Sequence, residues 1–174
     1  STGITIDNEN SIYITGTTTG DLDDQINSGD SDAFISKFNS DGDKQWTRLL
    51  GSSPGEKGGY QSESGKAIIT GNNNSIYIAG YTYGVIPAYR GAYGQYFSLS
   101  GHQKWGADDA FISKFNSNGE MQWTQLLGTR SSDFASGLSK VDDDSIVFIG
   151  TTFGHIGDNV DSPGYDAFVG KLLE

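Results

Sequence analysis

Apolar and polar residues alternate along several short stretches of the chain, and glycines or clusters of Asn and Asp separate these stretches. Such alternation is typical of β-strands with one buried face. In residues 11–16 and 32–38, however, apolar side chains also occupy the opposite parity, as Tyr13 does between Ile12 and Ile14. Because a strand that is apolar on both sides needs cover on both faces of its sheet, the pattern predicts an all-β fold of sheets packed on sheets.

One stretch of the chain occurs almost twice. Residues 109–128 repeat residues 32–51 with 16 of 20 positions identical, and a partial third copy begins at Asp166. Each full copy contains an apolar run, an Asn-Ser-Asp-Gly or Asn-Ser-Asn-Gly turn, and a second run that carries Trp46 or Trp123. Since Asn and Gly readily adopt the positive φ angles of tight turns, each copy is expected to form a β-hairpin.

A second repeated series lies before these hairpins and divides the chain into three units. A strand that ends in glycine recurs at residues 11–16, 75–80 and 145–150, and a polar turn precedes each copy. Before each turn we expect the first strand of the unit, so that each full unit is a four-stranded antiparallel meander. These first strands are expected at residues 3–6, 67–70 and 138–141. The units are expected at residues 3–51, 65–128 and 137–174, and the third lacks its outer strand.

Radial stacking of such meanders about an axis, as in a β-propeller, would cover both faces of each sheet. In such an arrangement the sheets lie close together near the axis and diverge outwards. The sequence agrees, because the first strands carry small residues and the fourth strands carry Trp46 and Trp123. We therefore interpret both Trp side chains as packing between sheets. The expected fold is therefore β-propeller-like, with three consecutive blades that form part of a larger or oligomeric propeller. Either copies of the chain associate, or the chain is a piece of a longer propeller; its start at Ser1 indicates a processed or excised piece.

The order of these motifs resembles the bacterial β-propeller repeat called the SBBP repeat. Its pattern is an Asn- or Asp-rich turn, a strand ending in Gly, a Thr-x-x-Gly step, and Asp-Ala-Phe-x-x-Lys followed by a Trp strand. The resemblance covers nearly the whole chain and is most specific at residues 32–51 and 109–128. It implies a propeller module of a bacterial exported or surface protein, extracellular or on the cell surface, and it brings no catalytic residues. Two features depart from the pattern: the long insertion at residues 85–108, and three units where closed propellers have 4 to 8 blades.

Charge and composition narrow the function classes. The formal net charge of −11 leaves no basic patch for nucleic acid, and no apolar run is long enough for a membrane helix. The absence of cysteine excludes disulfides, thiolate catalysis and Cys-ligated zinc. The sequence also contains no nucleophile elbow, phosphate loop or dinucleotide fingerprint. We therefore expect a protein that is not an enzyme and needs no cofactor.

The long loops should emerge together at one end of the meanders, which makes this end the candidate site. Aromatic residues concentrate in and beside the insertion at residues 85–108, where they either pack on themselves or bind a glycan or a protein. The candidate ligand-binding residues are Tyr83, Tyr89, Arg90, Tyr93, Tyr96 and Trp105. The expected function is thus a binding or spacer module.

Acidic loop residues support two weaker hypotheses. Five carboxylates in the first unit and three in the third could hold calcium, although no complete calcium-loop motif is present. These residues are Asp21, Asp23, Asp24, Asp30, Asp32, Asp158, Asp161 and Asp166. The alternative function is a hydrolase or lyase on a propeller scaffold, with an acidic pocket formed by residues such as Asp108, Asp158 or Asp161. The two histidines, His102 and His155, lie in loops and lack the third ligand of a zinc site.

Overall fold

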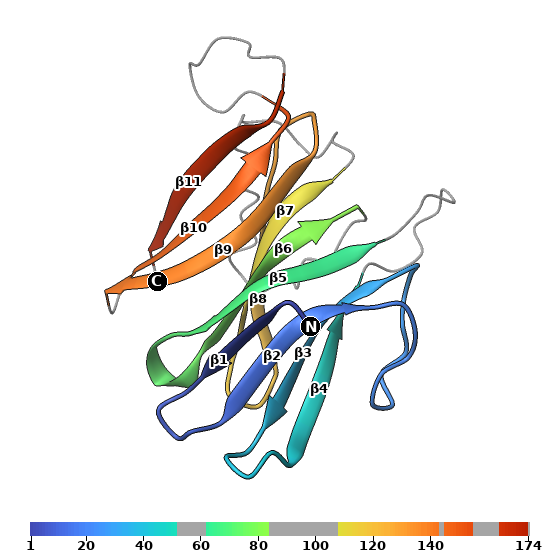
Figure 1. The fold of residues 1–174 in the computed structure, drawn as a ribbon, viewed down its shortest axis with the longest axis vertical. Coiled ribbons are helices and arrows are strands. Elements are labelled where there is room, and N and C mark those ends of the chain that lie inside the picture. The colour runs from blue at the N-terminus through green and yellow to red at the C-terminus, as the bar shows by residue number, and fades with distance from the viewer. Residues whose placement is uncertain (52–61, 84–107, 143–144, 155–163, 174) are drawn as a thin grey trace.

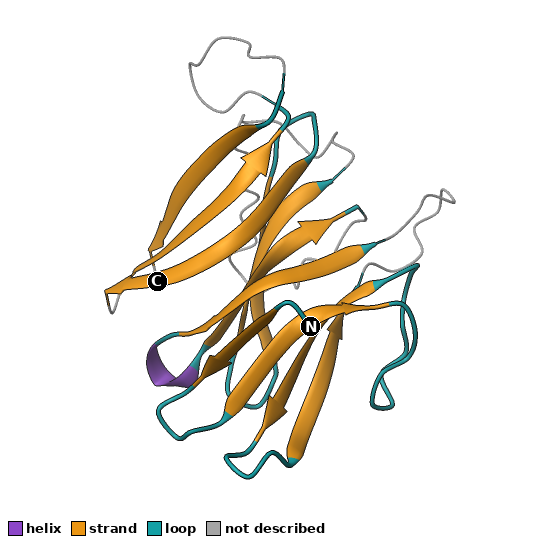
Figure 2. Cartoon of the chain, in the orientation of Figure 1, coloured by secondary structure: helices purple, strands orange, loops and turns teal. Residues whose placement is uncertain are grey.

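The computed structural model describes residues 1–51, 62–83, 108–142, 145–154 and 164–173, and within them the regular secondary structure is almost wholly β-strand (Figures 1 and 2). Eleven strands form three antiparallel sheets, each with its strands in sequence order. Sheet 1 contains β1 (Gly3–Ile6), β2 (Ile12–Thr18), β3 (Asp32–Phe38) and β4 (Lys44–Leu50). Sheet 2 contains β5 (Glu63–Thr70), β6 (Ile76–Thr82), β7 (Asp109–Phe115) and β8 (Met121–Leu127). Sheet 3 contains β9 (Asp133–Asp142), β10 (Ser145–Thr152) and β11 (Asp166–Leu173).

These elements confirm the predicted all-β architecture of repeated antiparallel sheets, the third of which has three strands in the part of the chain that the structure describes. The three sheets are not closed into a ring (Figure 1). A single 3₁₀ turn, η1 (Asn72–Asn74), joins β5 to β6, with Asn73 at a φ of 52°.

The tight turns form as their sequences predict. The side-chain oxygen of Asn39 accepts hydrogen bonds from the backbone amides of Asp41 and Asp43, at 3.1 and 2.7 Å, and Gly42 takes a φ of 87°. In sheet 2, Asn116 repeats these bonds, and Gly119 has a φ of 77°. The Asn side chain replaces a backbone acceptor and the glycine supplies the left-handed conformation, so the hairpin interpretation is confirmed.

The first strands of sheets 2 and 3 begin earlier than predicted. β5 starts at Glu63 and β9 at Asp133, whereas the alternation indicated starts at Ala67 and Leu138. The pairing register shifts between Gly65 and Ala67 in β5, and a second shift falls at the corresponding place in β9. A bulge adds one residue and reverses the parity of everything before it, which hides the first half of each strand from a period-2 pattern.

Sheet 2 is covered on both faces because it lies between the other two (Figure 1). Its first strand, β5, contacts β1, β2 and β3 of sheet 1, and β9 contacts β5, β6 and β7 of sheet 2 in the same way. Ile76 and Ile78 point towards sheet 1 and are fully buried in a cluster with Tyr13. On the opposite face, Ala79 and Ile112 are equally buried.

The fourth strand of sheet 1 reaches the turn between β7 and β8. The Trp46 ring packs so closely on this turn that a Cβ on Gly119 would lie 3.0 Å from it. Arg48 donates from Nε to the carbonyl oxygen of Gly119 at 3.1 Å. Trp123 packs in the second cluster, between sheets 2 and 3. Both Trp side chains therefore lie between sheets, as the sequence predicted.

Candidate functional site: an aromatic edge beside the long loops

The predicted ligand-binding residues fall mainly in the part of the chain that the structure does not describe. Tyr83, just beyond the end of β6, is described, and its side chain is 41% exposed. Tyr89, Arg90, Tyr93, Tyr96 and Trp105 lie outside the described residues. The described residues therefore do not test the prediction that these five residues bind a ligand.

Repeated backbone hydrogen bonds hold the long-loop end of the sheets together. Glu63 N donates to Ser31 O between sheets 2 and 1 at 2.8 Å, and Asp133 N donates to Asp108 O between sheets 3 and 2 at 2.8 Å. Phe153 N then donates to Ser132 O within sheet 3 at 2.9 Å. Each first strand thus fixes the residue that precedes a third strand, so side chains at this end sit on a rigid frame.

On this frame, aromatic rings from sheets 2 and 3 form a continuous row. Tyr81 meets Phe134 edge-on with ring centroids 4.9 Å apart, Phe134 meets Phe153 at 6.3 Å, and Phe153 meets Tyr165 at 3.7 Å. We call these four residues the aromatic edge. Tyr165 and Phe153 are 68% and 41% exposed, so the row leads from the partly buried contact of Tyr81 with Phe134 to open ring surface.

At the corresponding place between sheets 1 and 2, small hydroxyl side chains replace the two rings that meet between sheets 2 and 3. There, Thr17 and Ser64 occupy the positions of Tyr81 and Phe134, and their hydroxyl oxygens are hydrogen-bonded at 2.6 Å. Small hydroxyl side chains are enough to close that sheet contact. The aromatic residues between sheets 2 and 3 therefore exceed what the packing of two sheets requires at this position.

A cation also lies on the aromatic edge. Lys66, at the β-bulge of β5, places its Nζ 5.3 Å from the centroid of the Tyr81 ring. A cation above an aromatic face is attracted by the ring's negative quadrupole. The residue that the bulge adds to β5 is therefore the one that brings a charged group to this ring.

Sequence reasoning did not find Phe134, Phe153, Tyr165 or Lys66 because it looked within one insertion. A signal was nevertheless available: Phe153 lies 70 positions after Tyr83, and the second and third units share this offset. Comparing units position by position would have paired these two aromatics and shown that Thr19 replaces them in the first unit.

The buried acids at this end have structural partners. Asp133 accepts hydrogen bonds at Oδ2 from the backbone amide and the hydroxyl of Thr129, at 2.6 and 2.9 Å, and burial raises its pKa against the opposing effect of these bonds. Thr82 donates to the buried Glu63 at 2.7 Å. Asp108, a candidate for the acidic pocket, accepts a hydrogen bond from the Ser132 hydroxyl at 3.0 Å. Its predicted companions Asp158 and Asp161 lie outside the described residues.

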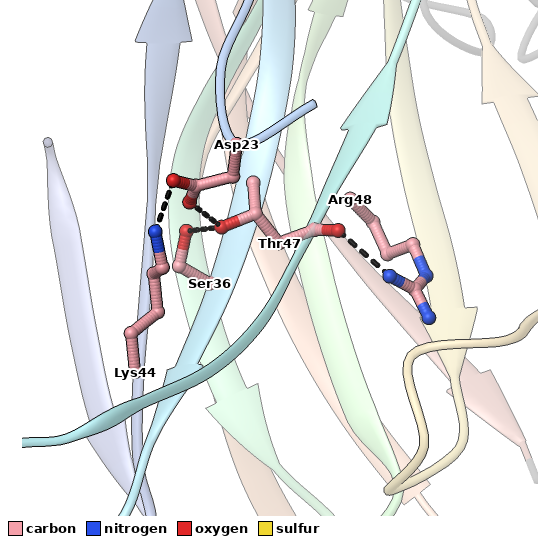
Figure 3. Close-up of polar contacts among 5 residues, drawn as sticks. All are labelled: Asp23, Ser36, Lys44, Thr47 and Arg48. Carbon is pink, nitrogen blue, oxygen red and sulfur yellow. Dashed lines mark hydrogen bonds and ion pairs between the residues drawn. The ribbon is translucent and has the colours of Figure 1, made fainter. Parts of the chain in front are cut away.

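The acidic loop of the first unit is bonded to protein donors. Asp23 forms an ion pair with Lys44 and accepts a hydrogen bond from Thr47, which is itself bonded to Ser36 at 2.8 Å (Figure 3). The bonds to Lys44 and Thr47 hold the pKa of Asp23 below its usual value. Asp32 accepts a hydrogen bond from the backbone amide of Ser28 at 3.1 Å. Among the described residues, no group of three or more His, Asp or Glu side chains could hold a metal ion, and calcium binding stays a prediction.

Comparison with known proteins leaves the family open. No protein-family model matches the chain, and no curated protein matches it either. The resemblance to the SBBP repeat therefore stays a prediction. As to membranes, the described ranges contain no helix with the length and apolar character that a crossing requires.

Proposed function

We propose that the chain is a non-enzymatic binding module, a β-propeller segment of an exported or surface-exposed bacterial protein, whose aromatic edge binds a neutral glycan. One observation carries the proposal: the row of rings that ends in the exposed Phe153 and Tyr165. Exposed aromatic residues fixed on a frame can bind a ligand with little loss of conformational entropy. A sugar ring presents an apolar face that stacks on such a surface.

Polar groups beside these rings supply the hydrogen bonds that a sugar needs. Ser132 O is bonded to the backbone amide of Phe153, and the Ser132 hydroxyl donates to the carboxylate of Asp108. A carboxylate and a hydroxyl next to an aromatic surface match the alternating apolar faces and hydroxyl groups of a sugar. Sites of this kind combine an apolar surface with a few fixed polar groups.

The overall charge favours a neutral ligand. With a formal net charge of −11, the chain repels polyanions such as nucleic acids and phosphate-rich polymers. A neutral glycan experiences no such repulsion. Tyrosine and phenylalanine also serve as anchors in protein interfaces, so a protein ligand for the same edge is the main competing outcome.

A glycan array with matched variants tests the proposal. The Phe153→Ala and Tyr165→Ala double variant should bind any neutral glycan that the wild type retains at least about tenfold more weakly, because the stacking surface is removed. Ile26→Ala is the control, since Ile26 is 80% exposed but lies in the first unit, between β2 and β3, away from the aromatic edge. Equal binding by the double variant, or a wild type that retains no neutral glycan, would overturn the proposal.

A further inference from the structure

The two sheet contacts inside the chain share one construction. In each, the later sheet contributes apolar side chains of its first two strands, such as Ile68 and Ile78, which are 6% and 0% exposed. We call this face, which looks towards the preceding sheet, the leading face; the opposite face is the trailing face. The earlier sheet contributes its trailing face, on which Tyr13 and Ile35 are 0% and 1% exposed.

The leading face of sheet 1 has the same side chains but no cover. Ile4, which corresponds to Ile68 of sheet 2, is 68% exposed, and Ile6 is 56% exposed. Ile12 and Ile14 are partly exposed where Ile76 and Ile78 are fully buried. The register of sheet 1 places these isoleucines on one face, so they form a continuous apolar surface.

The trailing face of sheet 3 is the complementary open surface. Val169 is 74% exposed, whereas Ile35 and Ile112, at the same position in sheets 1 and 2, are 1% and 0% exposed. Ile149 is 53% exposed at the position of Thr15, which is fully buried. The chain thus carries one half of a sheet contact at each end.

Sheet 3 needs no fourth strand to form such a contact. Within the chain, the first strand of the later sheet lies across the first three strands of the earlier one, as β5 lies across β1 to β3. Sheet 3 has the three corresponding strands, β9 to β11. Its trailing face therefore contains all three strands that the first strand of sheet 1 from a second copy would contact.

Sheet 1 is adapted to such a partner at its outer strands. In the contact between sheets 1 and 2, Trp46 of the fourth strand covers Gly119 next to Met121, which joins the core. At the equivalent places in sheet 1, Gly42 has open space around it, and Lys44 forms its ion pair with Asp23. The loop between β2 and β3, which carries Asp23, thus makes one part of the leading face of sheet 1 polar (Figure 3). This is the part that the fourth strand of a preceding sheet would cover.

From this correspondence we infer that the trailing face of sheet 3 docks on the leading face of sheet 1 of a second copy of the chain, head to tail. The contact continues the one that joins sheets 1, 2 and 3, and it does not depend on what the aromatic edge binds. The faces on the two sides differ, so the contact is heterologous and closes into a ring or extends as a chain of copies. Two copies of three sheets would place six sheets about one axis, within the 4 to 8 blades of propellers.

Side-chain volume and charge shape this contact. Ile149 is larger than Thr15 and Ala79 at its position, but Val147 is smaller than the corresponding Tyr13 and Tyr77, so the open face keeps a similar bulk. Each copy carries a net charge of −11, so copies repel one another at long range. Because salt screens this repulsion, association should strengthen as ionic strength rises.

Sedimentation velocity of the full chain with two single variants tests the docking. Ile4→Lys places a charge on the leading face and Val169→Lys places one on the trailing face, so each variant alone should dissociate about a hundredfold more readily than wild type. An equimolar mixture should regain a stable heterodimer, because the intact leading face of one variant meets the intact trailing face of the other. Asn8→Lys, with the same added charge at an exposed turn position, should sediment as wild type.

Each other outcome overturns the inference. A wild type that stays monomeric at the highest concentration shows that a different occupant, such as further repeats, covers the faces. Dissociation of one variant only shows a symmetric contact of one face with itself. Dissociation of both variants without recovery on mixing excludes the head-to-tail pairing, provided that circular dichroism shows both variants folded.

Discussion

The middle sheet and the two end sheets are built from the same repeat, yet they differ in how much of their apolar surface is covered. Ile68 in sheet 2 and Ile4 in sheet 1 are the same residue at the same place in the repeat, with exposed fractions of 6% and 68%. On the other side, Ile112 is buried and Val169 is 74% exposed. The difference shows that cover in this fold comes from the neighbouring sheet and not from within a unit, so the number of stacked sheets decides how much of each unit contributes to stability.

The largest expected effect compares Ile68→Ala with Ile4→Ala. Removing the buried Ile68 side chain should lower the free energy of unfolding by about 2–5 kcal/mol, because burial is lost and a cavity remains. Removing the exposed Ile4 side chain from a monomer should change it by less than about 0.5 kcal/mol. Urea denaturation at low protein concentration measures both values. Equal losses for the two variants would contradict the comparison.

The two tyrosines at the sheet contacts give the next effect. Tyr13 donates its hydroxyl to Asp7 Oδ2 at 2.9 Å, but the buried Tyr77 hydroxyl has no hydrogen-bond partner among the described residues, since Gly71 stands at the position of Asp7. Tyr13→Phe should therefore lower the free energy of unfolding by about 1–3 kcal/mol. Tyr77→Phe should leave it unchanged or raise it slightly, because the variant buries no unpaired polar group.

The remaining surroundings of the two rings match closely, which makes Tyr77→Phe a fair control. The Nζ atoms of Lys37 and Lys114 lie 5.3 and 5.2 Å from the ring centroids of Tyr13 and Tyr77. Each tyrosine ring also has a Trp ring beside it, with centroids 6.1 and 6.0 Å apart. A larger loss for Tyr77→Phe than for Tyr13→Phe would show that the bond to Asp7 does not distinguish the two contacts.

The smallest effect is the pH dependence that Asp7 gives to the contact between sheets 1 and 2. Burial works to raise the pKa of Asp7, but hydrogen bonds from Ser11, Tyr13 and Glu9 outweigh it and hold the pKa below its ordinary value of 3.8. A carboxyl group with a lowered pKa stabilises the fold above pH 3.8 and loses that contribution as the pH falls through its folded-state pKa. The stability difference between wild type and Asp7→Asn should therefore shrink on acidification below about pH 4. A difference that stays constant from neutral pH to pH 3 would contradict this assignment.

The strands and turns could be predicted because their signals are local. The Asn and Gly of the turn at residues 39–42 fix backbone conformation by themselves, and the repeated Asp-Ala-Phe run, with apolar residues at successive positions, indicates that β3 and β7 are buried on both faces. The stacking of sheets followed from residues that are apolar on both parities, such as those around Tyr13. Each of these inferences needed neighbours in sequence only.

The aromatic edge and the early strand starts could not be predicted in this way. Phe134 belongs to the first half of β9, before the register shift, where the period-2 pattern gives no strand. Its contact with Tyr81 crosses two sheets, and Tyr165 joins the row from the start of a third strand. Such contacts depend on how the sheets are placed in space. The strongest aromatic signal in the sequence, the insertion at residues 85–108, predicts a different set of rings.

The most direct test of head-to-tail stacking is a cross-link at its register. Ile68 and Thr15 both lie within 3.2 Å of the place that a Cβ on Gly3 would take, so the equivalent Ile4 of one copy and Ile149 of another should adjoin. The chain contains no cysteine, and a mixture of Ile4→Cys and Ile149→Cys proteins therefore reports this contact alone under mild oxidation. We predict a disulfide-linked heterodimer that forms faster than either homodimer. It should also form faster than the heterodimer from a control mixture of Ile4→Cys and Leu173→Cys proteins. Equal rates for all pairs, or a preference for the Ile4→Cys homodimer, would contradict head-to-tail stacking.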